Sequence, residues 1–497
     1  MNNKYDVIVI GAGNGGLSAA ATTASAGLKT LVLERHNLPG GSATSFVRGR
    51  FEFESALHEL CDIDMVQKLF QSYGVKENWH KENHMFHLLV PGKTDVVLPT
   101  GAEAMCDEME RQVPGCRPAV EELLRLGGMA NEAQQYAMSP DCDQKVMIEK
   151  YGDFLRMASS TTREEMEAIG IPGKAQNILE TYWCYLGADA DEMDFLTTCQ
   201  MIYKYCYLKP GMPEMKSHAL SLGLADSILK HGGDIWYNSE VSKILIEDGR
   251  AVGVICEGKE LRADHIIADC SPSKIMSSML EEKVQIPEKP LKLANARNIA
   301  LELETMYVGL NRSAEELGIK DYSTLIMSDE DTSLQRKKAN AEDKGVFIVN
   351  CLNNFIPDSS PEGTCTLFFT TFGDSSFWAG VKPEDYYKIK NQRMEDWVDY
   401  FEKCTGITIR PYIEEIAFAT PATFCRYLNS PNGTPYGYQI TFLDNIMSRL
   451  RSMDDEQMFQ NLRITGAAAE NADGYNLCYL NGHIQGMKTI ADAKEGR

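Results

Sequence analysis

The stretch KYDVIVIGAGNGGLSAAATTASAG, residues 4–27, decides the fold of this chain. Residues 4–10 are a largely apolar run, which is typical of a strand buried in a parallel sheet. Gly11, Gly13 and Gly16 follow at once at G-x-G-x-x-G spacing, and the small residues behind them predict a helix. Glycines at this spacing allow a tight turn, close approach of the backbone to a pyrophosphate, and close packing of the helix on the strand. The stretch therefore predicts the first strand and helix of a dinucleotide-binding domain.

The second predicted strand, residues 29–34 (KTLVLE), ends in an acid. Glu34 lies about 20 residues beyond the glycines, where a carboxylate accepts the ribose hydroxyls of an adenosine. The alternative is a solvated acid at the end of a strand, and the complete strand–helix–strand context argues against it. NAD and FAD both contain an adenosine, so Glu34 alone does not distinguish them.

A glycine pair follows Glu34 after a short polar link. Gly40 and Gly41 stand before Ser42, where an NAD dehydrogenase would normally continue into ordinary strand–helix units. A second close approach of backbone to phosphate suits a cofactor whose ribityl chain continues past the pyrophosphate. The pair therefore favours FAD, and a plain surface turn stays open as the alternative when the pair is judged alone.

Composition and charge exclude several classes of protein. The 497 residues predict two domains of conventional size. A formal charge of −22 argues against nucleic-acid binding, which needs Lys and Arg, and against a generally basic membrane-binding face. The 14 cysteines include no C-x-x-C pair, and the N-terminal sequence does not match a secretory signal. We expect free thiols, no membrane-spanning segment and a cytoplasmic location.

Four separated stretches resemble the flavoprotein superfamily of phytoene desaturases, carotenoid isomerases and retinol saturases. They cover both ends and the middle of the chain. In the first stretch, Ser42 follows the glycine pair, as in the isomerase and saturase branch, where desaturases and amine oxidases usually have Arg. Ala56 stands where many members have Gly. The stretches are residues 7–16 with 33–60, residues 224–272, residues 420–439, and residues 461–470 with 474–482.

The resemblance implies an α/β architecture, the two-domain FAD/NAD(P)-binding fold of the glutathione-reductase type. A discontinuous Rossmann-type FAD domain would combine residues 1–62, 215–290 and 450–497. A substrate-binding domain with a mixed sheet and helices would combine residues 63–214 and 291–449. Within the FAD domain, Asp248-Gly249 independently predicts a tight hairpin turn.

The same resemblance assigns the cofactor contacts. Ala467 departs from the family pattern, which often has Asp there, so one ribityl contact is in doubt. Gly474 and Gly482 match a terminal helix whose N-terminus points at the flavin pyrimidine and would stabilise negative charge on it. The expected FAD-binding residues are Gly11, Gly13, Asn14, Gly15, Gly16, Glu34, Arg35, Gly40, Gly41, Ser42, Val241, Gly466, Ala467, Gly474, Tyr475 and Asn476.

Flavin chemistry at a carbon–carbon bond needs few catalytic side chains. His58, in a segment that the family places beside the flavin, and Tyr436 are the candidates for supplying a proton, and structural packing is the alternative for each. Glu59 is expected to be a solvated acid. A metal site at His80, His84 and His87 is not expected, because the three need not share a face.

Residues 201–212, MIYKYCYLKPGM, are rich in aromatics and Met. Packing in the protein core is one interpretation. The wall of an apolar tunnel, or a lip that touches a membrane, is the other.

The expected function is an FAD-dependent oxidoreductase that saturates or desaturates a C–C bond of an apolar, polyunsaturated small molecule, by hydride transfer with flavin N5. No second G-x-G-x-x-G unit is present, so the electron source would be NAD(P)H docking transiently or another redox partner. Three alternatives stay open. They are a non-redox FAD-dependent cis/trans isomerase of a polyene, a flavin amine oxidase, and a lipid-binding carrier of the GDP-dissociation-inhibitor type.

Overall fold

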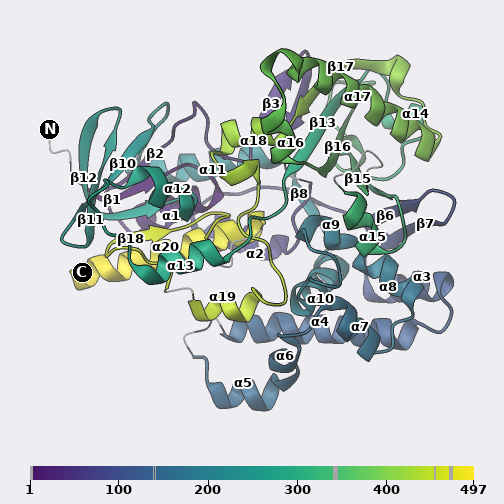
Figure 1. Ribbon diagram of the computed structural model, residues 1–497, viewed down its shortest axis with the longest axis horizontal. Helices are drawn as coiled ribbons and strands as arrows, with labels where there is room; N and C mark the ends of the chain where they lie inside the picture. The colour runs from purple at the N-terminus through teal and green to yellow at the C-terminus, as the bar shows by residue number, and fades with distance from the viewer. Residues whose placement is uncertain are drawn as a thin grey trace.

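The computed structural model describes residues 4–56, 58–137, 139, 141–339, 345–452, 455–469 and 474–496. Two sheets organise these residues (Figure 1). One sheet lies at the left with both chain ends, and the other lies at the upper right, above a group of helices. The architecture is the mixed α/β fold expected from the sequence.

The first sheet is assembled from distant parts of the chain. Its strand order is β10-β11-β12-β1-β2-β9, and β18 pairs with β12. The pairings of β1 with β2 and β12, of β2 with β9 and of β12 with β18 are parallel, as the apolar strands predict. The strands are β1 (Lys4–Ile10), β2 (Thr30–Leu33), β9 (Asp234–Trp236), β10 (Val241–Glu247), β11 (Arg250–Cys256), β12 (Lys259–Ala268) and β18 (Leu462–Ile464).

The predicted hairpin joins β10 and β11. Asp248 and Gly249 both have positive φ, of 49° and 78°, as a two-residue turn between twisted strands requires. Each strand of this sheet falls in residues 1–62, 215–290 or 450–497. We therefore keep that division of the chain into two discontinuous domains as a proposal.

Helices α1 (Asn14–Ser25), α11 (Lys216–Lys230) and α20 (Tyr475–Glu495) pack together beside this sheet. Small residues allow α1 and α20 to approach closely. An added Cβ at Gly482 would lie 2.2 Å from the carbonyl oxygen of Gly15. The last helix of the chain is therefore fixed against the first, and its N-terminus is held near the glycine loop.

The second sheet has the order β17-β13-β16-β15-β14-β6-β7. Helix α17 (Pro383–Thr405) covers one face, where Trp397 packs edge-on to Phe347 at 5.1 Å between ring centroids. Apart from β14 with β6, the pairings in this sheet are antiparallel. The strands are β6 (His84–Val90), β7 (Thr94–Pro99), β13 (Leu303–Leu310), β14 (Ser323–Met327), β15 (Val346–Cys351), β16 (Cys365–Phe372) and β17 (Ile413–Ala419).

A helical layer packs beneath the second sheet (Figure 1). Helices α4 and α10 approach closely at Gly127, where an added Cβ would lie 2.3 Å from the carbonyl oxygen of Cys199. The layer contains α3 (Ala102–Gln112), α4 (Arg117–Ala137), α5 (Gln144–Lys150), α6 (Gly152–Met157), α7 (Thr162–Ala168), α8 (Gly173–Leu179), η1 (Glu180–Tyr182), α9 (Trp183–Leu186), α10 (Phe195–Tyr203) and η2 (Lys204–Leu208).

Short elements connect these layers. The strands among them are β3 (Ser45–Arg48), β4 (Phe51–Glu54), β5 (Trp79–Lys81) and β8 (Gly211–Pro213). The helices are α2 (Ile63–Ser72), α12 (Pro272–Lys274), η3 (Ile275–Met279), α13 (Glu288–Ala296), α14 (Ala314–Leu317), α15 (Thr332–Lys338), η4 (Leu352–Asn354), α16 (Ser375–Gly380), η5 (Arg410–Tyr412), α18 (Pro421–Leu428), η6 (Pro431–Gly433) and α19 (Ile446–Ser452). Within the described ranges, no helix is both long and apolar enough to cross a membrane.

The histidine-rich segment lies on and before β6. His87 Nδ1 is 2.8 Å from Asp321, and its Nε2 is 2.7 Å from Asp95. Burial opposes the charge on His87, but hydrogen bonds with the two carboxylates outweigh it and raise the pKa of the imidazole. In the part of the chain that the structure describes, no group of three or more His, Cys, Asp or Glu side chains is placed to hold a metal ion.

Candidate functional site

A cavity of about 430 Å³ is lined by both sheets and the helical layer. All the residues that the sequence predicts for the cofactor and for catalysis line it, except Gly16. They come from the first 62 residues, from the start of β10, from the segment after α18, from the segment after β18 and from the N-terminus of α20. The fold therefore brings together residues more than 400 positions apart in the sequence.

The glycine loop and the glycine pair are in direct contact. The N–H of Gly40 donates to the carbonyl oxygen of Ala12 at 2.7 Å, and Gly13 and Gly40 form a parallel bridge. Gly11, with φ of 95°, turns the chain out of β1 and donates its N–H to Leu33 at 2.9 Å. The two glycine segments thus form one continuous backbone surface, which a second, unrelated surface turn would not do.

This surface has no room for side chains. A Cβ on Gly15 would lie 2.5 Å from the backbone nitrogen of Gly466, and a Cβ on Gly40 would lie 2.2 Å from the carbonyl oxygen of Ala43. Beside it, the buried Oδ1 of Asn14 has no hydrogen-bond partner among the described residues. A buried acceptor without a donor is costly unless a ligand supplies one.

Glu34 is buried at the end of β2. Its carboxylate accepts the N–H of Ala12 at 2.7 Å and the N–H of His36 at 2.7 Å. An ionised carboxylate has about four lone-pair sites, so two remain for ligand hydroxyls. The backbone holds the carboxylate toward the cavity. Because Glu34 is buried, it is not a solvated acid at a strand end.

The residues after Glu34 reach across to α18. Arg35 donates to the carbonyl oxygens of Arg426 and of Tyr427, the latter at 3.0 Å. His36 stacks on the Tyr427 ring with centroids 5.7 Å apart. Arg35 lines the cavity, but its hydrogen bonds join the two regions of the protein.

Asp269 is a cavity residue that the sequence analysis did not single out. It follows β12 and accepts the N–H of Gly16 at 2.9 Å, and a Cβ on Gly466 would lie 1.8 Å from its Oδ1. Burial raises the pKa of Asp269 to about 7. Its position at the carboxyl end of a strand beside β1 was the available signal, since parallel strands present such residues at one edge.

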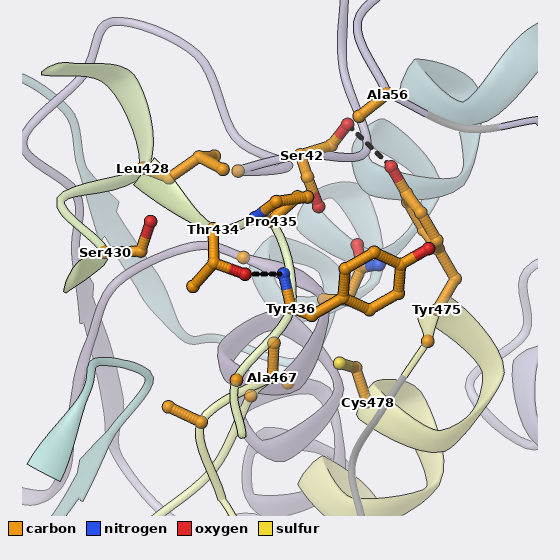
Figure 2. Close-up of a pocket in the computed structure, with 18 of the residues that line it drawn as sticks. Ser42, Ala56, Leu428, Ser430, Thr434, Pro435, Tyr436, Ala467, Tyr475 and Cys478 are labelled. Atoms are coloured by element: carbon orange, nitrogen blue, oxygen red, sulfur yellow. Dashed lines mark hydrogen bonds between the residues drawn. The ribbon is translucent and has the colours of Figure 1, made fainter. Parts of the chain in front are cut away.

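The N-terminus of α20 opens on the same cavity. Gly474, at the N-cap, has φ of 85°, and Gly474, Tyr475 and Asn476 all line the cavity. Tyr475 donates its hydroxyl to the carbonyl oxygen of Ser42 at 2.9 Å (Figure 2). The positive end of this helix dipole therefore faces the cavity and favours negative charge there.

Tyr436 lies beside Tyr475 at this end of the cavity. Its N–H donates to Oγ1 of Thr434 at 3.1 Å, and Figure 2 shows its ring directed toward Tyr475, above Ala467 and Cys478. Asn476 donates its side-chain amide to Cys61 Sγ at 3.7 Å, from the opposite wall. Val241, the first residue of β10, is buried and lines the same cavity as Glu34.

His58 lines the part of the cavity next to α9 and β16, which we call its inner end, and both of its ring nitrogens are engaged. Nδ1 is 3.2 Å from the Tyr185 hydroxyl, and Nε2 is 3.1 Å from Oγ1 of Thr370. Burial lowers the pKa of His58 to about 3, so its imidazole is neutral near pH 7. This arrangement favours a positioning role for His58 over proton supply.

The expectation that Glu59 is a solvated acid is wrong. Glu59 lines the cavity, Tyr205 donates to its Oε1 at 3.4 Å, and its Oε2 is buried with no hydrogen-bond partner among the described residues. Burial raises the pKa of Glu59 to about 8. The sequence did not indicate this, because the surrounding aromatic side chains come from α9 and η2.

Residues 201–212 are divided between the two expected roles. Met201, Lys204 and Tyr205 line the cavity, whereas Cys206 and Met212 are in the core. Tyr207 is 49% exposed. The segment therefore forms part of the cavity wall as well as packing in the core.

Comparisons with known proteins agree with this geometry. Residues 9–73 match the family model of an NAD(P)-binding Rossmann-like domain. The chain is 24% identical to an all-trans-retinol 13,14-reductase of Danio rerio (87% of this chain, 77% of the relative), and 23% identical to a chloroplastic prolycopene isomerase of Daucus carota (88% and 72%). A solved oxidoreductase of Methanosarcina mazei shares the fold, with a TM-score of 0.62, 17% identity and coverage of 98% and 100%. The site is thus that of a nucleotide-binding or flavin-binding protein.

Proposed function

We infer the function from one premise, that this chain fits the superfamily of phytoene desaturases, carotenoid isomerases and retinol saturases. We propose that it is an FAD-dependent oxidoreductase acting on a carbon–carbon double bond of an apolar, polyunsaturated small molecule. The observation that carries the proposal is the contact of Gly40 with the glycine loop, in a cavity that continues to the N-terminus of α20. A site for adenosine and pyrophosphate alone would not need this continuation.

The residues that would hold FAD follow the cavity in order. Glu34 and Val241 would bind the adenosine, and the glycine loop at the N-terminus of α1 would bind the pyrophosphate. The backbone from Gly40 to Ser42, with Gly466 and Ala467, would flank the ribityl chain. Residues 474–476 would face the flavin ring. When bound, the flavin supplies hydride chemistry.

The inner end of the cavity suits an apolar substrate. Its walls include Leu186, Met201, Leu301, Leu303 and Ile348, with tyrosines from α9 and η2. Closely packed apolar walls exclude water and position a chain by shape rather than by charge. The relatives' names, a retinol reductase and a prolycopene isomerase, support a polyene as the substrate class.

A cis/trans isomerase is the second candidate function. It is favoured by the 23% identity to the prolycopene isomerase and by Ser42 after the glycine pair. The same cavity would serve it, because the flavin would again lie beside a polyene. The two functions differ in product mass, since reduction adds two hydrogens and isomerisation adds none.

We also propose a cytoplasmic location and an external electron donor. The 14 cysteines are all free thiols, which supports a reducing compartment. The donor would be NAD(P)H or a redox partner. FAD would occupy the G-x-G-x-x-G unit at Gly11–Gly16, and the sequence has no second unit of this kind.

The test is an anaerobic visible spectrum of the purified protein with FAD, before and after addition of NADPH and then NADH, followed by product masses with retinoid and carotenoid substrates. We expect a yellow protein and a product heavier by two hydrogens. Isomerised product of unchanged mass would establish the second candidate. Oxygen-dependent loss of an amine would indicate an oxidase, and a protein that takes up no FAD would refute both and leave a carrier.

A further inference from the structure

We propose that Glu59 is the proton donor of the reaction, delivering its carboxyl proton to one carbon of the substrate double bond. The reaction in this inference rests on the proposed function. The choice of Glu59 as the donor rests on the structure. Glu59 stands at the inner end of the cavity, two residues before Cys61, whose Sγ accepts the amide of Asn476 at the start of α20. Glu59 therefore lines the same cavity as the apolar residues, on a segment that also contacts the N-terminus of α20.

The environment of Glu59 stabilises its neutral, proton-carrying form. Tyr182 packs on Tyr185 and Tyr205 with ring centroids 5.8 Å and 4.5 Å apart, forming an aromatic wall behind the carboxyl. Burial in this wall raises the pKa to about 8, against the opposing effect of the Tyr185 and Tyr205 hydroxyls. At pH 7 most of the carboxyl is protonated, as a general acid requires.

One oxygen of Glu59 has no hydrogen-bond partner among the described residues. Oε1 is within 3.4 Å of the Tyr205 hydroxyl, whereas Oε2 is buried and has no partner in the described part of the protein. A buried carboxyl oxygen without a partner is costly in a structural role. A neutral, protonated carboxyl lowers this cost relative to a carboxylate.

The other titratable groups near this carboxyl are less suitable donors. Both nitrogens of His58 are engaged and its pKa is lowered to about 3. Burial raises the pKa of the Cys61 thiol and of the nearby tyrosine hydroxyls (Tyr182, Tyr185 and Tyr205) further above neutrality. The titratable groups that interact with Glu59 are Glu82 after β5, Tyr182 on η1, Cys184 and Tyr185 on α9, Tyr205 on η2 and Tyr322 before β14, and His58 and Cys61 lie on its own segment.

The proposed step forms two C–H bonds across the substrate double bond. The substrate double bond is reduced by a hydride, which carries the electron pair and comes from the reduced flavin of the proposed function. The adjacent carbon forms a C–H bond with the Glu59 proton while the O–H bond breaks. Glu59 is left as a carboxylate and regains a proton from water. Glu59 is thus a catalytic residue, and His58, which contacts Tyr185, is a positioning residue.

The first test measures the carboxyl itself. We expect an infrared carbonyl band of a protonated carboxyl in the FAD-loaded protein that disappears with a midpoint near pH 8, is absent in Glu59→Gln and persists in Glu180→Gln. Glu180 is the matched control, because its carboxyl is also buried, has a pKa of about 7 and has an unpartnered oxygen, but it does not line the cavity. A Glu59 carboxylate already ionised at about pH 6 would overturn the inference.

The second test measures turnover. Glu59→Gln should lose about 100-fold in product formation while FAD content and reduction of the flavin stay unchanged, and Glu59→Asp should recover part of the loss. In D₂O the product of the wild type should carry solvent deuterium at the carbon that Glu59 serves. A wild type without FAD or without reduced product would refute the proposed function. A normal wild type with a fully active Glu59→Gln would refute only the role of Glu59.

Discussion

The two ends of the cavity are built in different ways. At the nucleotide end, backbone groups of the glycine loop, the glycine pair and the N-terminus of α20 form the surface, and Glu34 is held by two backbone N–H groups. At the inner end, side chains from the segment after β4, α9, η2 and β16 meet around Glu59. A backbone surface is set by local sequence, whereas a side-chain cluster is set by how distant segments pack. Substitutions therefore leave the hydrogen-bonding groups of the nucleotide end largely unchanged, because the backbone supplies them. At the inner end, a single substitution changes the groups that line the cavity.

The largest effect on FAD affinity is expected from a side chain placed in the backbone surface. Gly466→Ala puts a Cβ 1.8 Å from Asp269 Oδ1, so we expect FAD affinity to fall about 100-fold, or ~2.7 kcal/mol. Gly249→Ala is the matched control, because Gly249 has a similar φ of 78° against 86° but nothing within 4 Å of the added Cβ. Fluorescence titration of each protein with FAD gives the affinities, and thermal unfolding without FAD reports the strain that both share. Equal affinities would mean that the two ends are not built as described.

A change at Glu34 should be smaller and independent of the inner end. Glu34→Gln replaces a carboxylate oxygen by an amide that faces a backbone N–H, so the affinity for FAD should fall about tenfold, or ~1.4 kcal/mol. ADP should lose the same factor, since it shares the adenosine. Glu282→Gln, which removes the same charge from an exposed position, should bind both ligands normally. A loss confined to FAD would place Glu34 against the flavin half instead.

The inner end should appear in the pH dependence of stability. Because the pKa of Glu59 is raised to about 8, its contribution is fully present below the usual value of 4.5 and is lost as pH rises through 8. The free energy of unfolding should therefore fall with rising pH across this window, by at most about 1.4 kcal/mol per pH unit from this group. Urea unfolding of Glu59→Gln should show a shallower fall. Parallel curves for the two proteins would show that Glu59 is ionised in the folded state.

The smallest effect is expected outside the cavity, at His87. Its raised pKa makes its contribution complete below about 6.5 and lost above the folded value, while the lowered pKa of Asp321 makes that contribution present above 3.8 and lost in acid. His87→Gln should cost about 0.5–1 kcal/mol near pH 6 and less at pH 9, by urea unfolding. FAD binding should not change, which separates this half-buried cluster from the carboxyls of the cavity.

The glycine loop, Glu34 and the glycine pair could be predicted from the sequence because each of them is local. They lie within residues 11–41, and strand, turn and helix follow from their own residue types, whereas Gly466 and the N-terminus of α20 were assigned by the family resemblance. Asp269 and Glu59 escaped prediction because their burial depends on partners 253 and 146 residues away, Gly16 and Tyr205. His58 lines the cavity, but its hydroxyl partners lie on α9 and β16 and could not be predicted from its sequence neighbours.

The hydrogen bond between Asp269 and Gly16 bears on whether the protein folds before its cofactor binds. Its carboxyl joins the carboxyl end of β12 to the N–H of Gly16, so the turn after β1 is braced by the polypeptide itself. A loop braced in this way keeps its shape before any nucleotide arrives. We therefore expect the first sheet to form before the cofactor binds, and loss of the cofactor to leave a folded protein that can bind it again.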